Sequence, residues 1–171
     1  CSLDTSGCNA VCGNGVVEGA EECDDPTTKG AAGNGCSELC TKEPAAGELV
    51  ITEVMFDPTT TNDVGEYIEV YNASAGPLDL RGLRIARKGS TTQTHVITSA
   101  TPLVLAAGAY AVLANSSDTT KNGGVTPTYT WNPTSAIQLA NSSGPIEIRL
   151  EVASTPTLVV DAMSYPTSAS Y

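Results

Sequence analysis

The sequence predicts an all-β chain, a β-sandwich or β-barrel that follows a small disulfide-rich segment. All six cysteines lie between Cys1 and Cys40 of a 171-residue chain. From Glu48 onward, short β-rich runs alternate with turn-forming residues, and no stretch carries an apolar stripe of helical period over three turns. Many short strands at such spacing are typical of sandwiches and barrels.

The N-terminal cysteines indicate disulfides rather than a metal centre. A segment this short cannot bury enough apolar surface to fold unaided, so cross-links must substitute for a core. Disulfides place the chain in an oxidising compartment, either secreted, periplasmic or at the cell surface. Zinc is the weaker interpretation, because the only histidine, His95, lies far along the chain. Several connectivities are open to the six cysteines, which are Cys1, Cys8, Cys12, Cys23, Cys36 and Cys40.

The stretch from Cys12 to Cys40 combines a Cys-Gly-Asn-Gly turn, a Glu-Glu-Cys-Asp-Asp run and four spaced cysteines. It resembles the cysteine-rich repeat of surface and secreted proteins from myxobacteria and related bacteria, which also occurs in some large animal metalloproteases. The resemblance implies a bacterial protein of the cell exterior. The residues agree with it, because Asn14-Gly15 and Asn34-Gly35 are pairs that form tight turns.

Calcium is the one cofactor that this segment suggests, because hard cations take carboxylate and turn-carbonyl oxygens. The loop from Pro26 to Gly33 is poorer in Asp and Asn than the repeat it resembles, and it adds Lys29. We therefore favour a solvated acidic rim over a metal site. The carboxylates concerned are Glu18, Glu22, Asp24 and Asp25.

Cys1 and Cys8 lie outside the four-cysteine repeat, and two interpretations of them stay open. They form a disulfide with each other, or Cys1 is the lipidated first residue of a bacterial lipoprotein. A polar tether from Ser2 to Gly7 follows Cys1, as the second interpretation requires. Lipidation would leave Cys8 without its intrachain partner.

Composition changes at Pro44 to Gly47, where cysteines stop and turn density falls. The expected organisation is therefore a disulfide-rich module over 1–43, a linker over 44–47 and a β domain over 48–171.

Ten strands are expected in the β domain. In the second of them, Tyr67, Glu69 and Tyr71 lie on one face, and Ile68 and Val70 lie on the other. The expected strands are Leu49–Phe56, Glu66–Tyr71, Leu78–Arg87, Thr94–Thr98, Leu103–Leu105, Ala109–Ala114, Thr128–Trp131, Ile137–Ala140, Ile146–Val152 and Leu158–Met163.

The runs Glu48–Pro58, Gly65–Asn72 and Leu78–Ile85, with later runs that end at Tyr165, resemble a lamin tail domain over about residues 47–166. The resemblance implies an immunoglobulin-like β-sandwich whose role is mostly binding. In bacteria such domains are accessory parts of secreted proteins, often beside nucleases or hydrolases. The disulfide segment argues against the nuclear role that the family has in animals.

No catalytic residue is expected, and we predict that the chain is not an enzyme. Glu53, Asp57, Glu66 and Glu69 could converge near one sheet edge. The favoured interpretation is that Glu53 and Glu66 satisfy backbone donors while Glu69 faces solvent. His95 lacks a nucleophile partner, so a structural role is expected for it.

Net charge of −11 excludes nucleic acid as a partner, because a phosphate backbone requires a basic stripe. The small basic patch of Arg81, Arg84, Arg87 and Lys88 is interpreted as a solvated strand face. No apolar run approaches the roughly 20 residues that span a bilayer. Trp131 and the tyrosines are expected to pack in the core, with a sugar or peptide site as the alternative.

The function expected from these features is a non-catalytic binding or adhesion module. It would be extracellular or at the cell surface, and at the outer membrane surface if Cys1 is lipidated. A protein or a surface glycan is the expected partner. The alternative is a structural subunit that self-assembles into a filament through exposed sheet edges. An accessory domain of a secreted hydrolase ranks third.

Overall fold

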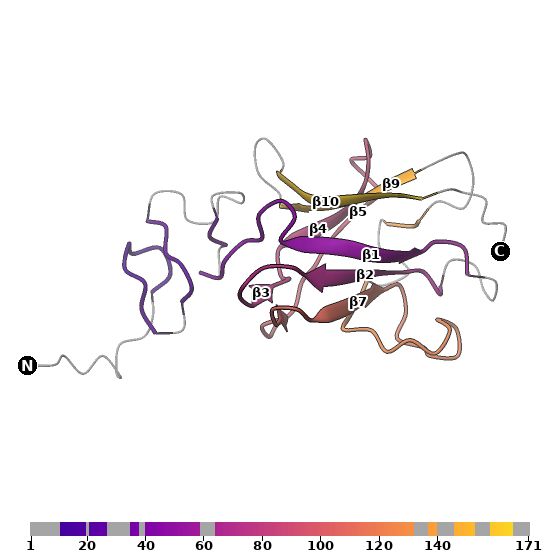
Figure 1. Ribbon diagram of the computed structural model, residues 1–171, viewed down its shortest axis with the longest axis horizontal. Helices are drawn as coiled ribbons and strands as arrows, with labels where there is room; N and C mark the ends of the chain where they lie inside the picture. The colour runs from indigo at the N-terminus through magenta and orange to yellow at the C-terminus, as the bar shows by residue number, and fades with distance from the viewer. Residues whose placement is uncertain are drawn as a thin grey trace, which may run out of the picture.

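The computed structural model describes residues 11–19, 21–26, 35–37, 40–58, 64–131, 137–139, 146–152 and 158–165, with the backbone alone at 146–148. These residues form ten strands and no helix, which confirms the all-β prediction. The strands build two four-stranded sheets and one two-stranded sheet (Figure 1).

The first sheet has the order β1-β2-β7-β8. It consists of β1 (Leu49–Met55), β2 (Tyr67–Asn72), β7 (Tyr110–Ala114) and β8 (Tyr129–Thr130). Neighbouring strands are antiparallel, except that β8 runs parallel to β7.

The second sheet has the order β10-β9-β4-β5, and all its neighbours are antiparallel. It consists of β10 (Leu158–Tyr165), β9 (Ile146–Val152), β4 (Leu83–Arg87) and β5 (Thr94–Val96). The two-stranded sheet pairs β3 (Leu78–Asp79) with β6 (Val104–Leu105).

The inner faces of the two four-stranded sheets share one hydrophobic core. Alternation explains it, because in β2, and over most of β4 and β7, every second side chain is apolar and buried. The first sheet contributes Ile68, Val70 and Leu113, and the second contributes Ile85 and Leu150. The arrangement is therefore a β-sandwich.

Nine of the ten expected strand regions contain a strand, and two details differ. The run Leu78–Arg87 divides at Gly82, whose φ of 82° lies in the left-handed region that glycine adopts without strain. The expected strand at Ile137–Ala140 is wrong, since residues 137–139 form none. Both carboxylate oxygens of Glu66 accept a hydrogen bond from the Leu139 N–H, each at 3.1 Å, so this amide is bonded to a side chain instead of a neighbouring strand.

The edge strands β1 and β10 lie against each other on one side of the sandwich. Each of them has an irregularity in its pairing with its inner neighbour, β2 or β9. The register shifts between Ile51 and Glu53 in β1, and between Val159 and Asp161 in β10. The Ile51 N–H donates to the Asp161 carboxylate at 2.7 Å, across the seam. Bulges and side-chain caps of this kind prevent an edge strand from pairing with another chain.

The opposite edges, β5 and β8, are closed by side chains. The strands have three and two residues, too short to template a long ladder. His95 Nε2 and the Tyr129 hydroxyl are 2.7 Å apart and join the two sheets, and the Thr98 N–H donates to the same hydroxyl at 3.3 Å.

Replacement of Asp161 by alanine is expected to lower the free energy of unfolding by about 1–2 kcal/mol, because the Ile51 N–H loses its acceptor at a half-buried seam. Asp161→Asn keeps a carbonyl oxygen there and should lose about half as much. Urea unfolding followed by fluorescence measures both variants. A stability of Asp161→Ala equal to that of the wild type would contradict the role given to this bond.

The cysteine segment is defined as residues 11–43, and its described residues lie beyond the end of the sandwich at which β1 begins (indigo in Figure 1). Two disulfides cross-link it, Cys12–Cys40 and Cys23–Cys36. Cys1 and Cys8 lie outside the described residues. The Lys42 ammonium pairs with Glu48 at 2.7 Å, next to the start of β1. The division into 1–43, 44–47 and 48–171 stays a prediction.

Candidate binding face

An aromatic surface covers the outer face of the first sheet. In β2, Tyr67, Glu69 and Tyr71 alternate with the buried Ile68 and Val70, as the sequence predicts. In the neighbouring β7, Tyr110 is the register partner of Tyr71 and is 58% exposed. We call the surface formed by Glu53, Tyr67, Glu69, Tyr71 and Tyr110 the tyrosine face.

Tyr71 and Tyr110 form a ring pair whose centroids are 4.8 Å apart, in a tilted arrangement. A cross-strand aromatic pair of this kind stabilises a sheet, but by less than the burial of one large side chain in the core. The turn before β7 passes close to them, because Gly108 has a φ of 73° and its position for a Cβ atom lies 3.9 Å from the Tyr71 hydroxyl. The ring pair is therefore held in place, with Tyr71 half-buried and Tyr110 exposed to solvent.

A β-bulge places two polar residues of β1 on the same outer face. Thr52 is the extra residue at the register shift, and both Thr52 and Glu53 are exposed. The Tyr67 hydroxyl donates to the Glu53 carboxylate at 2.6 Å. The Thr52 hydroxyl donates to the Glu69 carboxylate at 2.8 Å. Neutral donors thus fix both carboxylates beside the tyrosines.

The four acidic residues considered for catalysis do not form one site. Glu66 is fully buried and accepts a backbone hydrogen bond, as expected from the sequence. Glu53 differs from the expectation, since it accepts a hydrogen bond from the Tyr67 hydroxyl instead of a backbone N–H. Glu69 is half-buried on the outer face, and Asp57 is exposed beyond the end of β1.

His95 has a structural partner. Its ring lies 5.7 Å from the ring of Tyr129, and its Nε2 is hydrogen-bonded to the Tyr129 hydroxyl. Burial lowers the pKa of His95 below its ordinary value. As a neutral imidazole that joins two sheet edges, His95 has a structural role, and no catalytic role is needed to explain its position.

The carboxylates of the cysteine segment accept hydrogen bonds from its own turns. The backbone N–H groups of Gly13, Asn14 and Gly15 donate to Asp24 at 2.9, 3.2 and 2.9 Å. Desolvation raises the pKa of Asp24, but these three hydrogen bonds together outweigh it, and the pKa lies below its ordinary value. Asp24 therefore organises the Asn14-Gly15 turn.

Glu18 and Glu22, two further carboxylates considered for calcium, also have donors within the segment. Glu18 accepts from the Asn14 side-chain amide at 2.6 Å, and Glu22 accepts from the Lys42 N–H at 2.9 Å. Asp25 adjoins Asp24. These hydrogen bonds use part of the oxygen lone pairs that a calcium ion would require.

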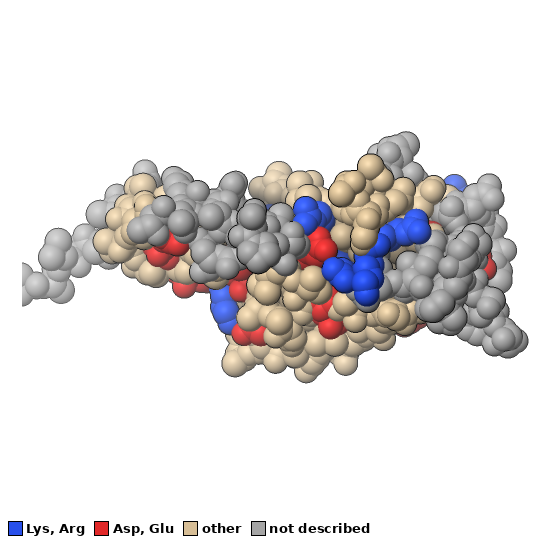
Figure 2. Space-filling view, turned by 90° about the horizontal axis from the view of Figure 1, so that it is seen from above, with Lys and Arg blue, Asp and Glu red and all other residues tan. Residues whose placement is uncertain are grey.

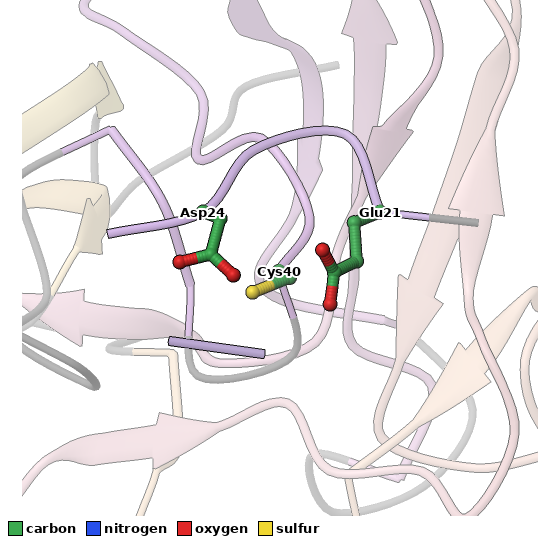
Figure 3. Close-up of side chains that lie close together, drawn as sticks. All are labelled: Glu21, Asp24 and Cys40. Carbon is green, nitrogen blue, oxygen red and sulfur yellow. The ribbon is translucent and has the colours of Figure 1, made fainter. Parts of the chain in front are cut away.

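One group of potential metal ligands occurs among the described residues. Figure 3 shows the carboxylates of Glu21 and Asp24 on either side of the Cys40 sulfur, and the ligand atoms of the three lie within 4.8 Å of one another. The Cys40 sulfur is bonded to Cys12, however, so it is no thiolate. Glu21 also accepts from the Glu18 N–H at 3.0 Å. The donor set fits a disulfide-stabilised turn better than a metal.

The basic residues of the strands lie on the second sheet, away from the tyrosine face. Strands β1, β2 and β7 contain no Lys, Arg or His, whereas β4 and β9 carry Arg84, Arg87 and Arg149. Figure 2, seen from the side of β9 and β10, shows lysine and arginine side chains gathered over the middle of the sandwich.

The expected solvated basic patch is largely engaged in intramolecular contacts. Arg84 pairs with Glu151 at 2.8 Å, Arg81 pairs with the buried Asp79, and Arg87 donates to the Gln138 carbonyl at 3.4 Å. These contacts reduce its capacity to bind an external anion.

Trp131 lies in the core with no exposed surface, as expected, and cannot contribute to a surface site. Tyr165 is also buried and stacks on Phe56 at 4.7 Å. The expectation of core packing is wrong for Tyr67, Tyr71 and Tyr110. The signal for Tyr110 is present in the sequence, because Tyr110 and Val112 alternate with the buried Ala111 and Leu113.

Comparison with known proteins gives a family match. No curated protein matches the chain. The described residues contain no helix long and apolar enough to cross a membrane. The lamin tail domain family matches residues 42–166, well over half of the chain. This match agrees with a β-sandwich built by the strands from Leu49 to Tyr165. The chain therefore belongs to the lamin tail domain family and has its immunoglobulin-like fold.

Proposed function

We propose that this protein is a non-catalytic binding module of the cell exterior that engages its partner through the tyrosine face. The observation that carries the proposal is the ring pair of Tyr71, which is half-buried, and Tyr110, which is exposed, on an ordered sheet and flanked by two carboxylates. Tyrosine is enriched in binding surfaces because its ring offers a large contact area and its hydroxyl a hydrogen bond. The two disulfides indicate an oxidising compartment.

A catalytic role has less support than a binding role. Each acidic or imidazole group considered for catalysis has a structural partner or stands alone, as described above. A secreted hydrolase that carries this chain as an accessory domain is compatible with the proposal, since the binding face would then target the enzyme. Incubation of the purified chain with panels of glycan, peptide and ester substrates should leave them unchanged, and turnover of any of them would contradict a purely binding role.

Assembly through sheet edges is the second function considered, and the fold weighs against it. Among the described strands, β1 and β10 close against each other through the Asp161 side chain, and β5 and β8 close through His95 and Tyr129. A closed edge offers few unpaired backbone groups to a neighbouring chain. Electron microscopy and size-exclusion chromatography over a range of concentrations test this directly, and filaments that survive disruption of the tyrosine face would favour the assembly role.

Anchoring and calcium binding stay separate proposals. Lipidation of Cys1 is tested by intact mass spectrometry of protein from its native source, where acyl chains on Cys1 support it and a free amine overturns it. Calcium binding to the cysteine segment is tested by calorimetry with Ca²⁺, and an absence of heat and of any melting shift would overturn it. The resemblance of Cys12–Cys40 to a bacterial surface repeat supports a bacterial origin at the cell surface.

Binding arrays test the proposed function. Wild-type protein and the double variant Tyr71→Thr/Tyr110→Thr should be applied to arrays of extracellular glycans and of short peptides. Threonine is a good strand former, so the sheet should be preserved, and the fluorescence of the buried Trp131 checks this. We expect ligands that the wild type retains and the double variant loses. Signals that are the same for both proteins would overturn the assignment of the face.

A further inference from the structure

We infer that the tyrosine face recognises a cationic polypeptide segment, with an arginine or lysine side chain seated between Glu53 and Glu69. The inference rests on the proposed function and deepens it by giving the partner's chemistry. It follows from the pairing of the two glutamates, from the distribution of basic residues over the two sheets and from the adjoining tyrosines.

Glu53 and Glu69 are direct register partners across β1 and β2. Like charges directly opposite each other destabilise a sheet, so this pair opposes folding. The hydrogen bonds from the Tyr67 and Thr52 hydroxyls do not neutralise the charges, because the donors are neutral. Among the described residues, no ion pair joins either glutamate to a lysine or arginine.

The strands of the first sheet place no cation beside these two carboxylates. Strands β1, β2 and β7, which carry the tyrosine face, contain no Lys, Arg or His, whereas Arg84, Arg87 and Arg149 lie on β4 and β9 of the second sheet. The chain thus retains an unfavourable pair on an exposed, otherwise well-ordered face. Local conflicts of this kind are expected at functional sites, where a ligand supplies the missing interaction.

A guanidinium or ammonium group supplies that interaction. A guanidinium has five N–H donors in a planar fork and can bond two carboxylates at once. The hydroxyls of Tyr67 and Thr52 already hold Glu53 and Glu69 in place, so little side-chain entropy is lost on binding.

The tyrosines extend the site along the strand. Tyr67, Glu69 and Tyr71 occupy alternate positions of β2, so the outer tyrosines are separated by about 13 Å of strand, which is the length of about four extended residues. A cation between the glutamates would lie between these aromatic rings. The flat sides of tyrosine rings attract cations, and the rings also pack against the methylene stems of arginine and lysine.

The charge of the whole chain favours the same partner. With a net charge of −11, the protein attracts cationic segments and repels nucleic acids, anionic glycans and further copies of itself. A neutral glycan could stack on the tyrosines, but it would leave the repulsion between Glu53 and Glu69 unrelieved. A polypeptide with basic side chains can pair with the two carboxylates and also pack against the tyrosine rings.

Calorimetric titration with a matched peptide pair tests the inference. The probe is acetyl-Arg-Gly-Arg-Gly-Arg-Gly-amide, and the control replaces each arginine with citrulline, which has nearly the same shape and no charge. We expect the arginine peptide to bind at least about tenfold more tightly at about 20 mM salt, with the difference shrinking at about 300 mM salt. Equal affinity for the two peptides would overturn the inference.

Charge-removing variants locate the site. Glu53→Gln and Glu69→Gln keep an oxygen that accepts from the Tyr67 or Thr52 hydroxyl, so the local hydrogen bonds persist. Each variant should lower the affinity for the arginine peptide by about tenfold. Because the repulsion between the two glutamates is removed, each should also raise Tm by about 1 °C. Glu22→Gln removes the same charge from the cysteine segment and should leave the affinity unchanged. A fall in Tm, or an affinity that Glu53→Gln and Glu69→Gln do not change, would contradict the seat between the glutamates.

A third arm separates this inference from the proposed function. Maltohexaose and cellohexaose are titrated into the wild type and into Tyr71→Thr/Tyr110→Thr. Sugar binding that depends on the two tyrosines, with no preference for arginine over citrulline, would overturn the cationic partner and leave a binding role for the face. Arginine-peptide binding that is unaffected by the tyrosine and glutamate variants would overturn both.

Discussion

Replacement of Asp79 by alanine is expected to destabilise the sandwich by about 3–5 kcal/mol, one of the two largest effects expected of any change considered for this protein. The Asp79 side chain is 1% exposed, and the Arg81 side chain with which it pairs is 13% exposed. Removal of one partner of a buried ion pair leaves the other charge without compensation in a medium that solvates it poorly.

The contacts of Asp79 explain the size of the effect. Arg81 Nε donates to both carboxylate oxygens, at 3.0 and 2.8 Å, and Arg81 Nη2 donates to one of them. The backbone N–H groups of Arg81 and Leu103 donate to the same carboxylate at 3.0 and 3.3 Å. Asp79 thus holds together the turn after β3 and the chain that enters β6. Its loss would leave several donors unpaired.

Asp79→Asn is the matched control, because it keeps the shape and an oxygen acceptor but removes the charge. We expect it to cost about 2 kcal/mol near neutral pH. Desolvation raises the pKa of Asp79, but the hydrogen bonds and charge of Arg81 outweigh it, and the pKa lies below its ordinary value. The stabilisation by the ionised group is therefore present above the unfolded pKa of about 3.9 and is lost as pH falls through the folded value.

Urea unfolding of the wild type and both variants between neutral and strongly acidic pH measures these effects. The stability difference between wild type and Asp79→Asn should shrink as the pH falls below about 4. A difference that is constant over the whole pH range would show that the carboxylate charge does not stabilise the fold. A cost below about 1 kcal/mol for Asp79→Ala would contradict the buried pair.

Removal of the disulfides is expected to unfold the cysteine segment and leave the sandwich folded. Cys12–Cys40 and Cys23–Cys36 close loops with separations of 28 and 13 residues, for which the chain-entropy argument gives about 3–4 kcal/mol each. The segment has little else to stabilise it, since Val16 and Val17 are both 59% exposed. The sandwich keeps its own core, and the sequence from Thr41 onward contains no cysteine.

Limited proteolysis under reduction measures this effect, with Trp131 as an internal reporter. Trp131 is the only tryptophan and is fully buried in the sandwich, so its fluorescence reports on that part alone. Dithiothreitol, or Cys23→Ser/Cys36→Ser as a variant, should expose residues 11–43 to cleavage while the Trp131 emission stays unchanged. Simultaneous loss of the Trp131 signal would show that the two parts fold as one unit and would contradict the predicted boundary at 44–47.

Alternation made much of the sandwich predictable from the sequence. The pattern Tyr-Ile-Glu-Val-Tyr gives the buried and exposed faces of β2 without a structure, and the same rule applies to β7. The strand expected at Ile137–Ala140 failed for a physical reason. The carboxylate of Glu66 binds the Leu139 N–H, and no local pattern in the sequence reveals a partner 73 residues away.

The binding face needed the register of the strands, which the sequence alone does not give. Glu53 and Glu69 become neighbours because a bulge at Thr52 shifts the pairing of β1 with β2. Tyr71 and Tyr110 meet because β7 pairs with β2 across 38 intervening residues of other structure. The disulfide pairing is likewise a result of the three-dimensional fold, since the spacing of the cysteines permits several connectivities.

Amide NMR of the ¹⁵N-labelled protein during titration with the arginine peptide tests the central claim most directly. We predict that the amide resonances of β1, β2 and β7 around Thr52, Glu69 and Tyr110 change their chemical shifts, while those of β5 and β9 stay unchanged. Perturbations confined to the seam of β1 with β10, or to the cysteine segment, would contradict recognition through the tyrosine face.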